Sequence, residues 1–196
     1  MSKAIVDKLG GEEGDKALIR GDLVVKPIRS NHLIPRPISD GARLFFPACD
    51  GSETIADAHD VFKSGISMDF KRWGLSGPSE ATIKTSAEVY DELRSNSLTK
   101  ELFTFLSPCL DFLCVTGHQI RSFCKEHSDW LCDEDYETFF ITKKNWKVPA
   151  NFDNLFVAYV YVLYDGLYLS VYQFERDFMR LADGPLRRLV FPQLVA

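Results

Sequence analysis

The chain has 196 residues, of which 45% are hydrophobic and 26% are charged, and its formal net charge is −5. This length can support a domain with a hydrophobic core, whereas the negative charge argues against a protein whose main task is to grip the nucleic-acid backbone. The first residues hold no apolar run of signal-peptide length and nothing else is membrane-directed, so we expect a cytoplasmic protein with no membrane partner.

In chain order, the first distinct segment is residues 29–41, whose two prolines predict an extended connector. Residues 43–49 (RLFFPAC) are typical of a strand. The spacing of apolar residues over 53–63 predicts a helix, which a glycine then ends. We expect a strand at residues 66–70 and a second helix that begins between residues 79 and 86.

The middle of the chain is predicted to be mainly helical. Ser97 is a plausible N-cap for a third helix, which Pro108 would end. Residues 110–131 again have helical spacing, with a possible break near Gly117. Residues 136–142 (YETFFIT) are rich in aromatic and β-branched side chains, and they predict a strand.

The longest apolar run, residues 155–174, is the densest in β-branched and aromatic side chains. We interpret it as two antiparallel strands joined by a two-residue loop at Asp165-Gly166, a pair that such turns favour. Nearly continuous apolar character indicates that both faces of this hairpin are covered. The competing interpretation is one long buried helix, because a helical spacing also fits the run and residues 171–181 look helical.

These elements predict a single α+β domain over residues 1–196. We expect a small, mostly antiparallel sheet with the hairpin 155–174 at its centre, packed by four or five helices. Residues 185–196 would form an apolar C-terminal tail, which must pack on its own domain or on a neighbouring copy. A homo-oligomer formed through this tail is therefore possible.

Five potential metal ligands fall within nineteen residues, and their side chains are of the types that zinc prefers. Their spacing matches no familiar motif, and several of them could equally form the inward face of a helix, so we expect no bound metal and no cofactor. The chain has five cysteines, an odd number that is typical of reduced thiols. The candidate ligands are Cys114, His118, Cys124, His127 and Cys132.

A short acidic segment surrounds two aromatic residues and forms the predicted binding site. Such a surface could be presented to a partner with a basic surface, although a solvated turn is the commoner outcome for a charge cluster this short. The residues are Trp130, Asp133, Glu134, Asp135 and Tyr136.

One segment is similar to a known enzyme family. Residues 43–66, a strand followed by SETIADAHDVFKSGI, resemble the opening of the ADP-ribosyltransferase fold, and Lys84-Thr85-Ser86 resembles that family's Ser-Thr-Ser strand. The resemblance implies an enzyme that grips a nicotinamide dinucleotide through Arg43, Ser86 and an acid, either Glu134 or Glu137. Because the likeness covers a minor part of the chain, it supplies the alternative hypothesis.

Other catalytic patterns are mostly absent from the sequence, which has no phosphate-binding P-loop, no G-x-S-x-G elbow and no H-E-x-x-H motif. Aromatic residues make up 13% of the chain, and several of them stand beside charged residues, as they do in many interfaces. We therefore expect a non-catalytic protein-protein interaction protein, either an assembly component or an inhibitor or adaptor of another macromolecule.

Overall fold

The computed structural model describes residues 33–35, 44–92, 103–104, 106–107, 109–131, 135–144, 146–151, 153–175 and 186–193. All of them belong to the unit Asn31–Ala196. Most of the predicted connector 29–41, most of the helix expected after Ser97 and residues 176–185 lie outside the described residues. The prediction of one domain over the whole chain stays a prediction.

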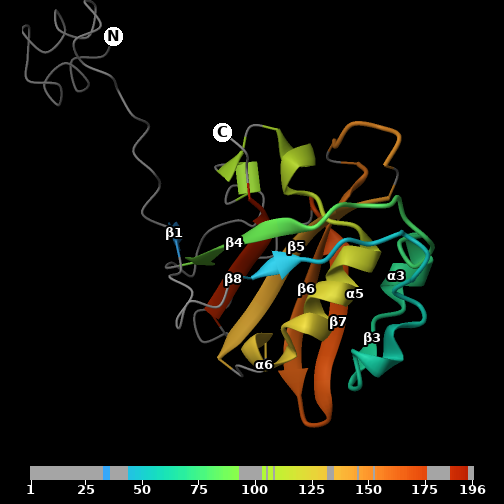
Figure 1. Ribbon diagram of the computed structural model, residues 1–196, viewed down its shortest axis with the longest axis vertical. Helices are drawn as coiled ribbons and strands as arrows, with labels where there is room; N and C mark the ends of the chain where they lie inside the picture. Colours follow the sequence, from blue (N-terminus) through green and yellow to red (C-terminus); the bar gives the residue numbers. More distant parts are fainter. Residues whose placement is uncertain are drawn as a thin grey trace, which may run out of the picture. The chain divides into compact units, whose positions relative to one another are not determined.

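The described residues form a mixed sheet with the strand order β1-β4-β8-β5-β6-β7-β3, in which β2 pairs with β4 off this path (Figure 1). β5 pairs with β8 and β3 with β7 in parallel, while the other neighbours are antiparallel. The strands are β1 (Leu33–Pro35), β2 (Phe45–Phe46), β3 (Gly65–Ile66), β4 (Thr85–Glu92), β5 (Tyr136–Lys143), β6 (Leu155–Leu163), β7 (Gly166–Gln173) and β8 (Leu186–Pro192).

Three α-helices have described bounds, and only α5 is longer than four residues. They are α3 (Asp69–Arg72), α5 (Gly117–Glu126) and α6 (Ser128–Leu131), with the 3-10 helices η2 (Ala58–Asp60) and η3 (Leu110–Leu113). The predicted small, mostly antiparallel sheet packed by four or five helices is therefore wrong. No helix among the described residues is long and apolar enough to cross a membrane.

The two errors in helix content have different physical causes. In β4, alternate residues Ala87 and Val89 are buried, and this two-residue period was mistaken for a helical one. Over residues 53–63, the predicted inward side chains Ile55 and Phe62 are buried, but only the three residues of η2 are helical. The segment is tied to α5 instead, where Arg121 and Lys125 pair with Asp60.

The hairpin 155–174 is confirmed, because β6 and β7 pair in antiparallel register from Phe156↔Gln173 to Leu163↔Gly166. Its two-residue loop is Tyr164–Asp165, one residue earlier than predicted. Gly166 has the positive φ of 133° and takes the position after the turn. The centre of the sheet is β5, and the hairpin lies to one side of it, with β6 next to β5.

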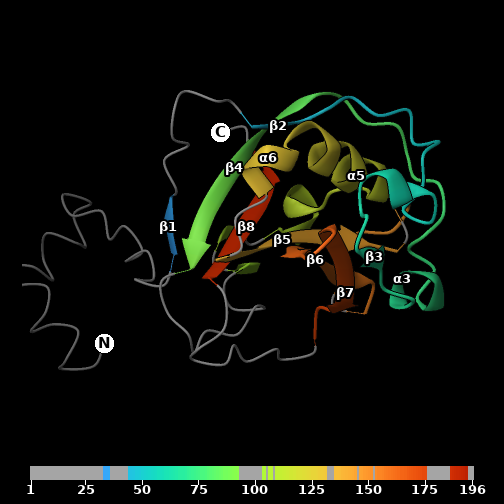
Figure 2. The same cartoon turned by 90° about the horizontal axis from the view of Figure 1, so that it is seen from below.

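Both faces of the sheet carry a hydrophobic core, as the nearly continuous apolar pattern of β6 predicted. On one face α5 and α6 cover the sheet, and Phe123 of α5 packs with Phe140 of β5 and Ala158 of β6 (Figure 2). On the other face Leu113 of η3 packs with Ile141 and Val157. Because both faces of the sheet are covered, consecutive residues of the central strands are buried.

The helix α5 begins with a capping box, in which the Thr116 hydroxyl accepts from the Gln119 amide and the Gln119 side chain accepts from the Thr116 amide. Ile120, Phe123 and Cys124 then form its buried face. The alternative interpretation of the candidate metal ligands put Ile120, Cys124, His127 and Leu131 on one inward helix face; Ile120 and Cys124 do share the buried face of α5, whereas the helix ends before His127.

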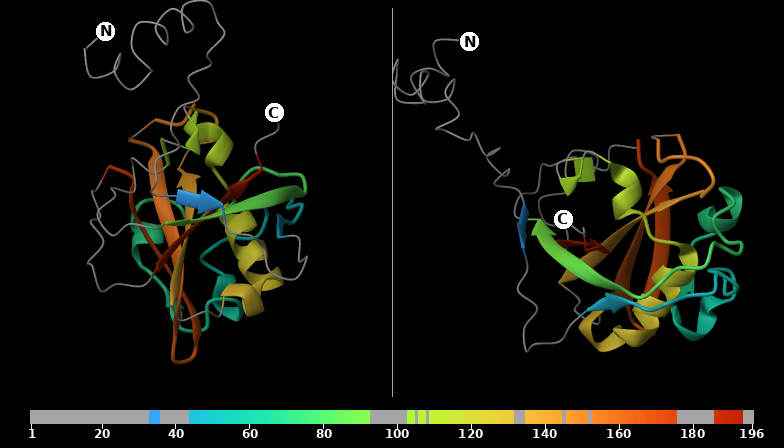
Figure 3. Two further views of the ribbon diagram at one scale, coloured as in Figure 1. Left: turned by 90° about the vertical axis from the view of Figure 1, so that its left-hand side faces the viewer. Right: turned by 45° about the horizontal axis from the view of Figure 1, so that its top comes forward.

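The predicted C-terminal tail is in fact the strand β8. It pairs with β4 on one side and β5 on the other, and Leu189, Val190 and Phe191 are buried within the chain. Figure 3 shows this strand behind β4, whose two ends pair with β1 and β2. These side chains are therefore covered within the chain, residues 194–196 lie outside the described residues, and a homo-oligomer through the tail stays a prediction.

Candidate functional site

The structure does not bring the described residues of the enzyme hypothesis together. Ser86 pairs with Phe45, and its carbonyl accepts a hydrogen bond from Gln193 just beyond β8. Glu137 pairs with Arg187 near the start of β8. The two β8-side partners, Gln193 and Arg187, are six residues apart, which corresponds to about 20 Å of extended chain. Arg43 and Glu134 lie outside the described residues.

The candidate metal ligands also lie apart. Cys114 belongs to one hydrophobic core and Cys124 to the other. The ring of His118 binds the loop before η2, and that of His127 binds the backbone of Phe45. Cys132 lies outside the described residues, and within them no group of three or more His, Cys, Asp or Glu side chains could hold a metal ion.

Burial makes two of the thiols unreactive. Desolvation raises the pKa of Cys114 to about 12 and also raises the pKa of Cys124. Both side chains are therefore neutral thiols near pH 7, whereas the thiolate is the form that attacks a substrate or binds a metal.

The aromatic residues of the predicted binding site are engaged inside the molecule. The guanidinium of the fully buried Arg188 lies 4.2 Å from the ring centroid of Trp130 and 4.0 Å from that of Tyr136. It also donates to the Trp130 carbonyl at 3.3 Å. These contacts are cation–π interactions in a desolvated site, and they occupy ring faces that a partner would otherwise use.

The acidic part of that site is described only at Asp135, which is exposed and whose carbonyl accepts from the Leu186 amide at 2.8 Å. Asp133 and Glu134 lie outside the described residues. A partner with a basic surface at this segment stays a prediction.

A polar pocket of about 420 Å³ lies between residues 48–53 and the first turns of α5. The Gly51 amide donates to Nδ1 of His118 at 3.1 Å, so this nitrogen is unprotonated and the ring proton is on Nε2, 3.4 Å from a Glu53 carboxylate oxygen. Arg121 pairs with the same Glu53 oxygen at 3.0 Å.

Both ring nitrogens of His118 are thus occupied, and the imidazole is not free to act as a base for a nucleophile. The nearby Cys49 thiol contacts the Pro47 carbonyl at 3.4 Å and the Ser122 hydroxyl at 3.6 Å. Hydrogen bonds from Ser52 lower the pKa of Asp50, which keeps that carboxylate ionised. This arrangement holds the loop in place and lacks an activated catalytic group.

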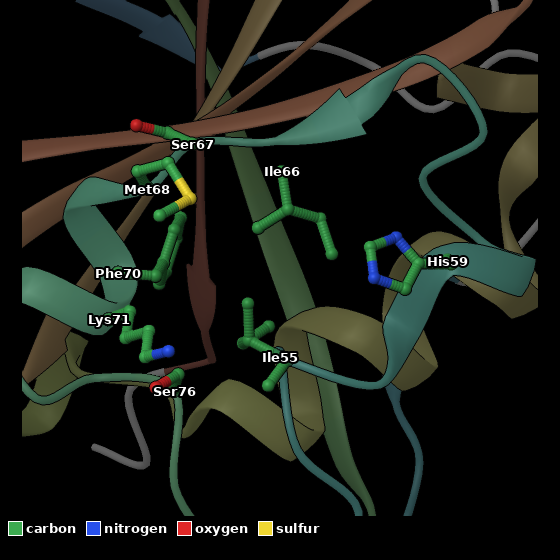
Figure 4. Close-up of a pocket in the computed structure, with 9 residues that line it drawn as sticks. Ile55, His59, Ile66, Ser67, Met68, Phe70, Lys71 and Ser76 are labelled. Atoms are coloured by element: carbon green, nitrogen blue, oxygen red, sulfur yellow. The ribbon is translucent and has the colours of Figure 1, made fainter.

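A second pocket, of about 330 Å³, lies beside the outermost strand β3, and we call it the β3 pocket (Figure 4). Segments from the loop before η2, from η2, β3 and α3, and from the turn after α3 surround it. Its lining residues are Ile55, Ala56, His59, Ile66, Ser67, Met68, Phe70, Lys71 and Ser76.

The floor of the β3 pocket is apolar, because Ile55, Ile66 and Phe70 face it from three different segments. Ile55 and Phe70 are buried in the core beneath. Met68 stands at the edge and is 77% exposed. Such an exposed, unbranched and polarisable side chain beside an apolar floor is typical of adaptable binding surfaces.

The rim of the β3 pocket carries basic side chains. Lys71 and His59 make no ion pair among the described residues, and they approach from opposite sides (Figure 4). Of the nearby carboxylates, Asp60 pairs with cations on α5 and Asp69 with Arg72, whereas Asp57 accepts from the Thr54 hydroxyl. Lys71 is therefore a rim cation that makes no ion pair among the described residues, on a chain whose net charge is −5.

The sequence analysis missed this pocket. The helix predicted over residues 53–63 would have buried Ile55 and His59 on one face, and residues 66–70 were expected to form a strand. The available signal was weak, namely apolar residues that alternate over 66–70, one of them a methionine, followed directly by Lys71.

Comparisons of the chain with protein-family models, with curated proteins and with solved structures found no match. The function is therefore argued from the geometry alone.

Proposed function

We propose that the chain is a non-catalytic protein-protein interaction protein, an assembly component or an inhibitor or adaptor, and that the β3 pocket is its docking site. The observation that carries this proposal is an open apolar pocket whose rim holds an exposed methionine and Lys71, a cation that makes no ion pair among the described residues. The other described clusters of polar and aromatic side chains are engaged within the chain. We also propose a cytoplasmic location, which the four free described cysteines support.

The chemistry of the pocket defines the segment that it would accept. Its volume of about 330 Å³ suits one large apolar side chain and not an extended ligand. The Lys71 ammonium at the rim favours a carboxylate close to that side chain. The partner segment would therefore be an apolar residue followed or preceded closely by Asp or Glu.

Selection from a random peptide library displayed on phage tests this proposal. Wild-type protein should enrich peptides in which a large apolar residue lies within about two positions of an acid, a reach set by the extended rise per residue. The variant Lys71→Glu should lose the acid and enrich Lys or Arg at the same position, because the charge of the rim is reversed.

The matched control is Lys147→Glu, which makes the same change in net charge at an exposed loop position that does not line the pocket. It should select the wild-type motif. Thermal unfolding of all three proteins checks that they are folded. The same motif for wild type and Lys71→Glu, or no motif at all, would refute the docking site.

A further inference from the structure

The tip of the β6–β7 hairpin carries the chemistry that the β3 pocket is suited to bind. We call Leu163, Tyr164 and Asp165 the hairpin tip. Tyr164 is fully exposed and Leu163 is 40% exposed. Asp165 is also exposed, and its carboxylate makes no ion pair or hydrogen bond among the described residues. Figure 1 shows the tip extending beyond the helices that cover the sheet.

An aromatic side chain followed directly by a carboxylate is the segment that we proposed for the pocket. Tyrosine is enriched among residues that dominate binding energy, because a large rigid ring is buried at a small cost in side-chain entropy. The Asp165 carboxylate would meet the Lys71 ammonium at the rim. The tip and the pocket are thus complementary in both apolar character and charge.

The tip cannot be filling the pocket of its own chain, because Tyr164 is fully exposed in the structure. The two features are neighbours, however, since β3 pairs with β7 at Gly65↔Tyr168. Tyr168 is four residues from Tyr164, so the tip extends about 13 Å beyond the Gly65–Tyr168 pair along the hairpin. Because one chain carries both the tip and the pocket, two copies can form a closed two-fold dimer in which each tip contacts the pocket of the other copy.

We propose that the partner is a second copy of this chain, in a symmetric dimer where Tyr164 of each copy enters the β3 pocket of the other and Asp165 pairs with Lys71. This inference rests on the proposed docking site. The contact joins only two tips and two pockets, so the dimer is weak, with a Kd on the order of 10–100 µM.

Sedimentation equilibrium of the full chain, over loading concentrations from about 5 to about 500 µM, measures this dimer. Wild type should pass from monomer to dimer and no further. Tyr164→Ser should raise the Kd at least about tenfold, as expected for a central aromatic anchor. The control Ile83→Ser replaces another exposed apolar residue, which is 81% exposed and neither lines the pocket nor belongs to the tip, and it should leave the Kd unchanged.

A charge exchange makes the test specific. Lys71→Glu and Asp165→Lys should each weaken the dimer, because each places like charges together in both contacts. An equimolar mixture of these two variants should dimerise again. In the mixed dimer one contact is the wild-type pair, and the other pairs the two introduced charges in reversed order.

Three results would overturn the dimer: a monomer throughout the concentration range, a Kd unaffected by Tyr164→Ser, or no recovery in the mixture. Species larger than a dimer would also overturn it, since they indicate an open head-to-tail chain. If the protein is monomeric while the peptide selection yields the apolar-acidic motif, only this inference fails. If the selection also yields no motif, the docking site fails with it.

Discussion

The ion pair between Lys143 and Asp111 gives the sharpest test of how this fold is held together. Lys143 ends β5, and its side chain is only 7% exposed, whereas that of Asp111 in η3 is 31% exposed. The Lys143 ammonium donates to Asp111 and to the Val148 carbonyl, and it lies 5.0 Å from the Trp146 ring centroid. The pair therefore joins η3 to the sheet and to the loop after β5.

The unequal burial predicts unequal costs for removing the two charges. Asp111→Asn removes the counter-charge and leaves a buried ammonium with only neutral acceptors and one ring face, so it should lower the free energy of unfolding by about 2–3 kcal/mol. Lys143→Met keeps most of the apolar stem and leaves a carboxylate that is partly solvated and still accepts from the Ala150 amide. Its cost should be about 1 kcal/mol, and the double variant should cost less than the sum.

Urea unfolding at pH 7, followed by circular dichroism, measures the four free energies of this cycle. The coupling between the two substitutions should be about 1–2 kcal/mol. If Lys143→Met proves costlier than Asp111→Asn, or if the two effects are additive, the unequal desolvation of the pair is not the cause of its energetics.

The same pair predicts a pH dependence. Desolvation alone would raise the pKa of Asp111, but hydrogen bonds from Lys143 and the Ala150 amide outweigh it, and the pKa in the folded state lies below the ordinary value of 3.8. A carboxylate with a lowered folded pKa stabilises the fold above its unfolded pKa, and this contribution is lost as the pH falls through the folded pKa. The difference between wild type and Asp111→Asn should therefore shrink below about pH 4.

Two further predictions concern a tight loop and the thiols. Gly51 has φ +81°, and a Cβ there would lie 2.1 Å from a backbone oxygen. Gly51→Ala should therefore lower the free energy of unfolding in urea by at least about 2 kcal/mol. A Cβ at Gly77 would meet nothing within 4 Å, so Gly77→Ala should change this free energy by less than about 1 kcal/mol. Equal effects of the two substitutions would contradict the geometry. Iodoacetamide at pH 8, read by peptide mass spectrometry, should label the exposed Cys109 in the folded protein but Cys114 and Cys124 only after unfolding. Labelling of all three at the same rate would show that the cores open readily.

The parts of the fold that were predictable are those where one periodicity stands alone. The run 155–174 combines dense β-branched residues with an Asp-Gly pair, and the strand at 136–142 has no competing helical pattern. In residues 85–92 two patterns overlap, because Ala87 and Tyr90 fit a helix while Ala87 and Val89 fit a strand. Pairing with β8 decides in favour of the strand, and that partner is about a hundred residues away in the chain.

The strand β8 shows the same dependence on distant partners. In the sequence, Leu186–Pro192 is an apolar segment after a glycine and a proline, and it gives no sign of which surface covers it. In the structure it enters the sheet between β4 and β5 and becomes one of the most buried strands. A homo-oligomer could not be predicted from this segment, because apolar character alone does not distinguish a sheet interior from an interface.

The candidate site was harder to predict than the fold, for a reason that Trp130 and Tyr136 illustrate. Aromatic residues beside acids are found both at interfaces and around buried cations, and here the cation is Arg188, more than fifty residues further along the chain. The apolar residues of the β3 pocket pose the opposite problem, because in sequence they resemble core residues. Ile55 and Phe70 are indeed core residues, whereas Ile66 is only partly buried and Met68 is 77% exposed, a difference that only the folded arrangement reveals. An interaction site on this protein is therefore to be sought where apolar side chains and Lys71 remain unmatched, and not where aromatic and charged residues are merely adjacent in sequence.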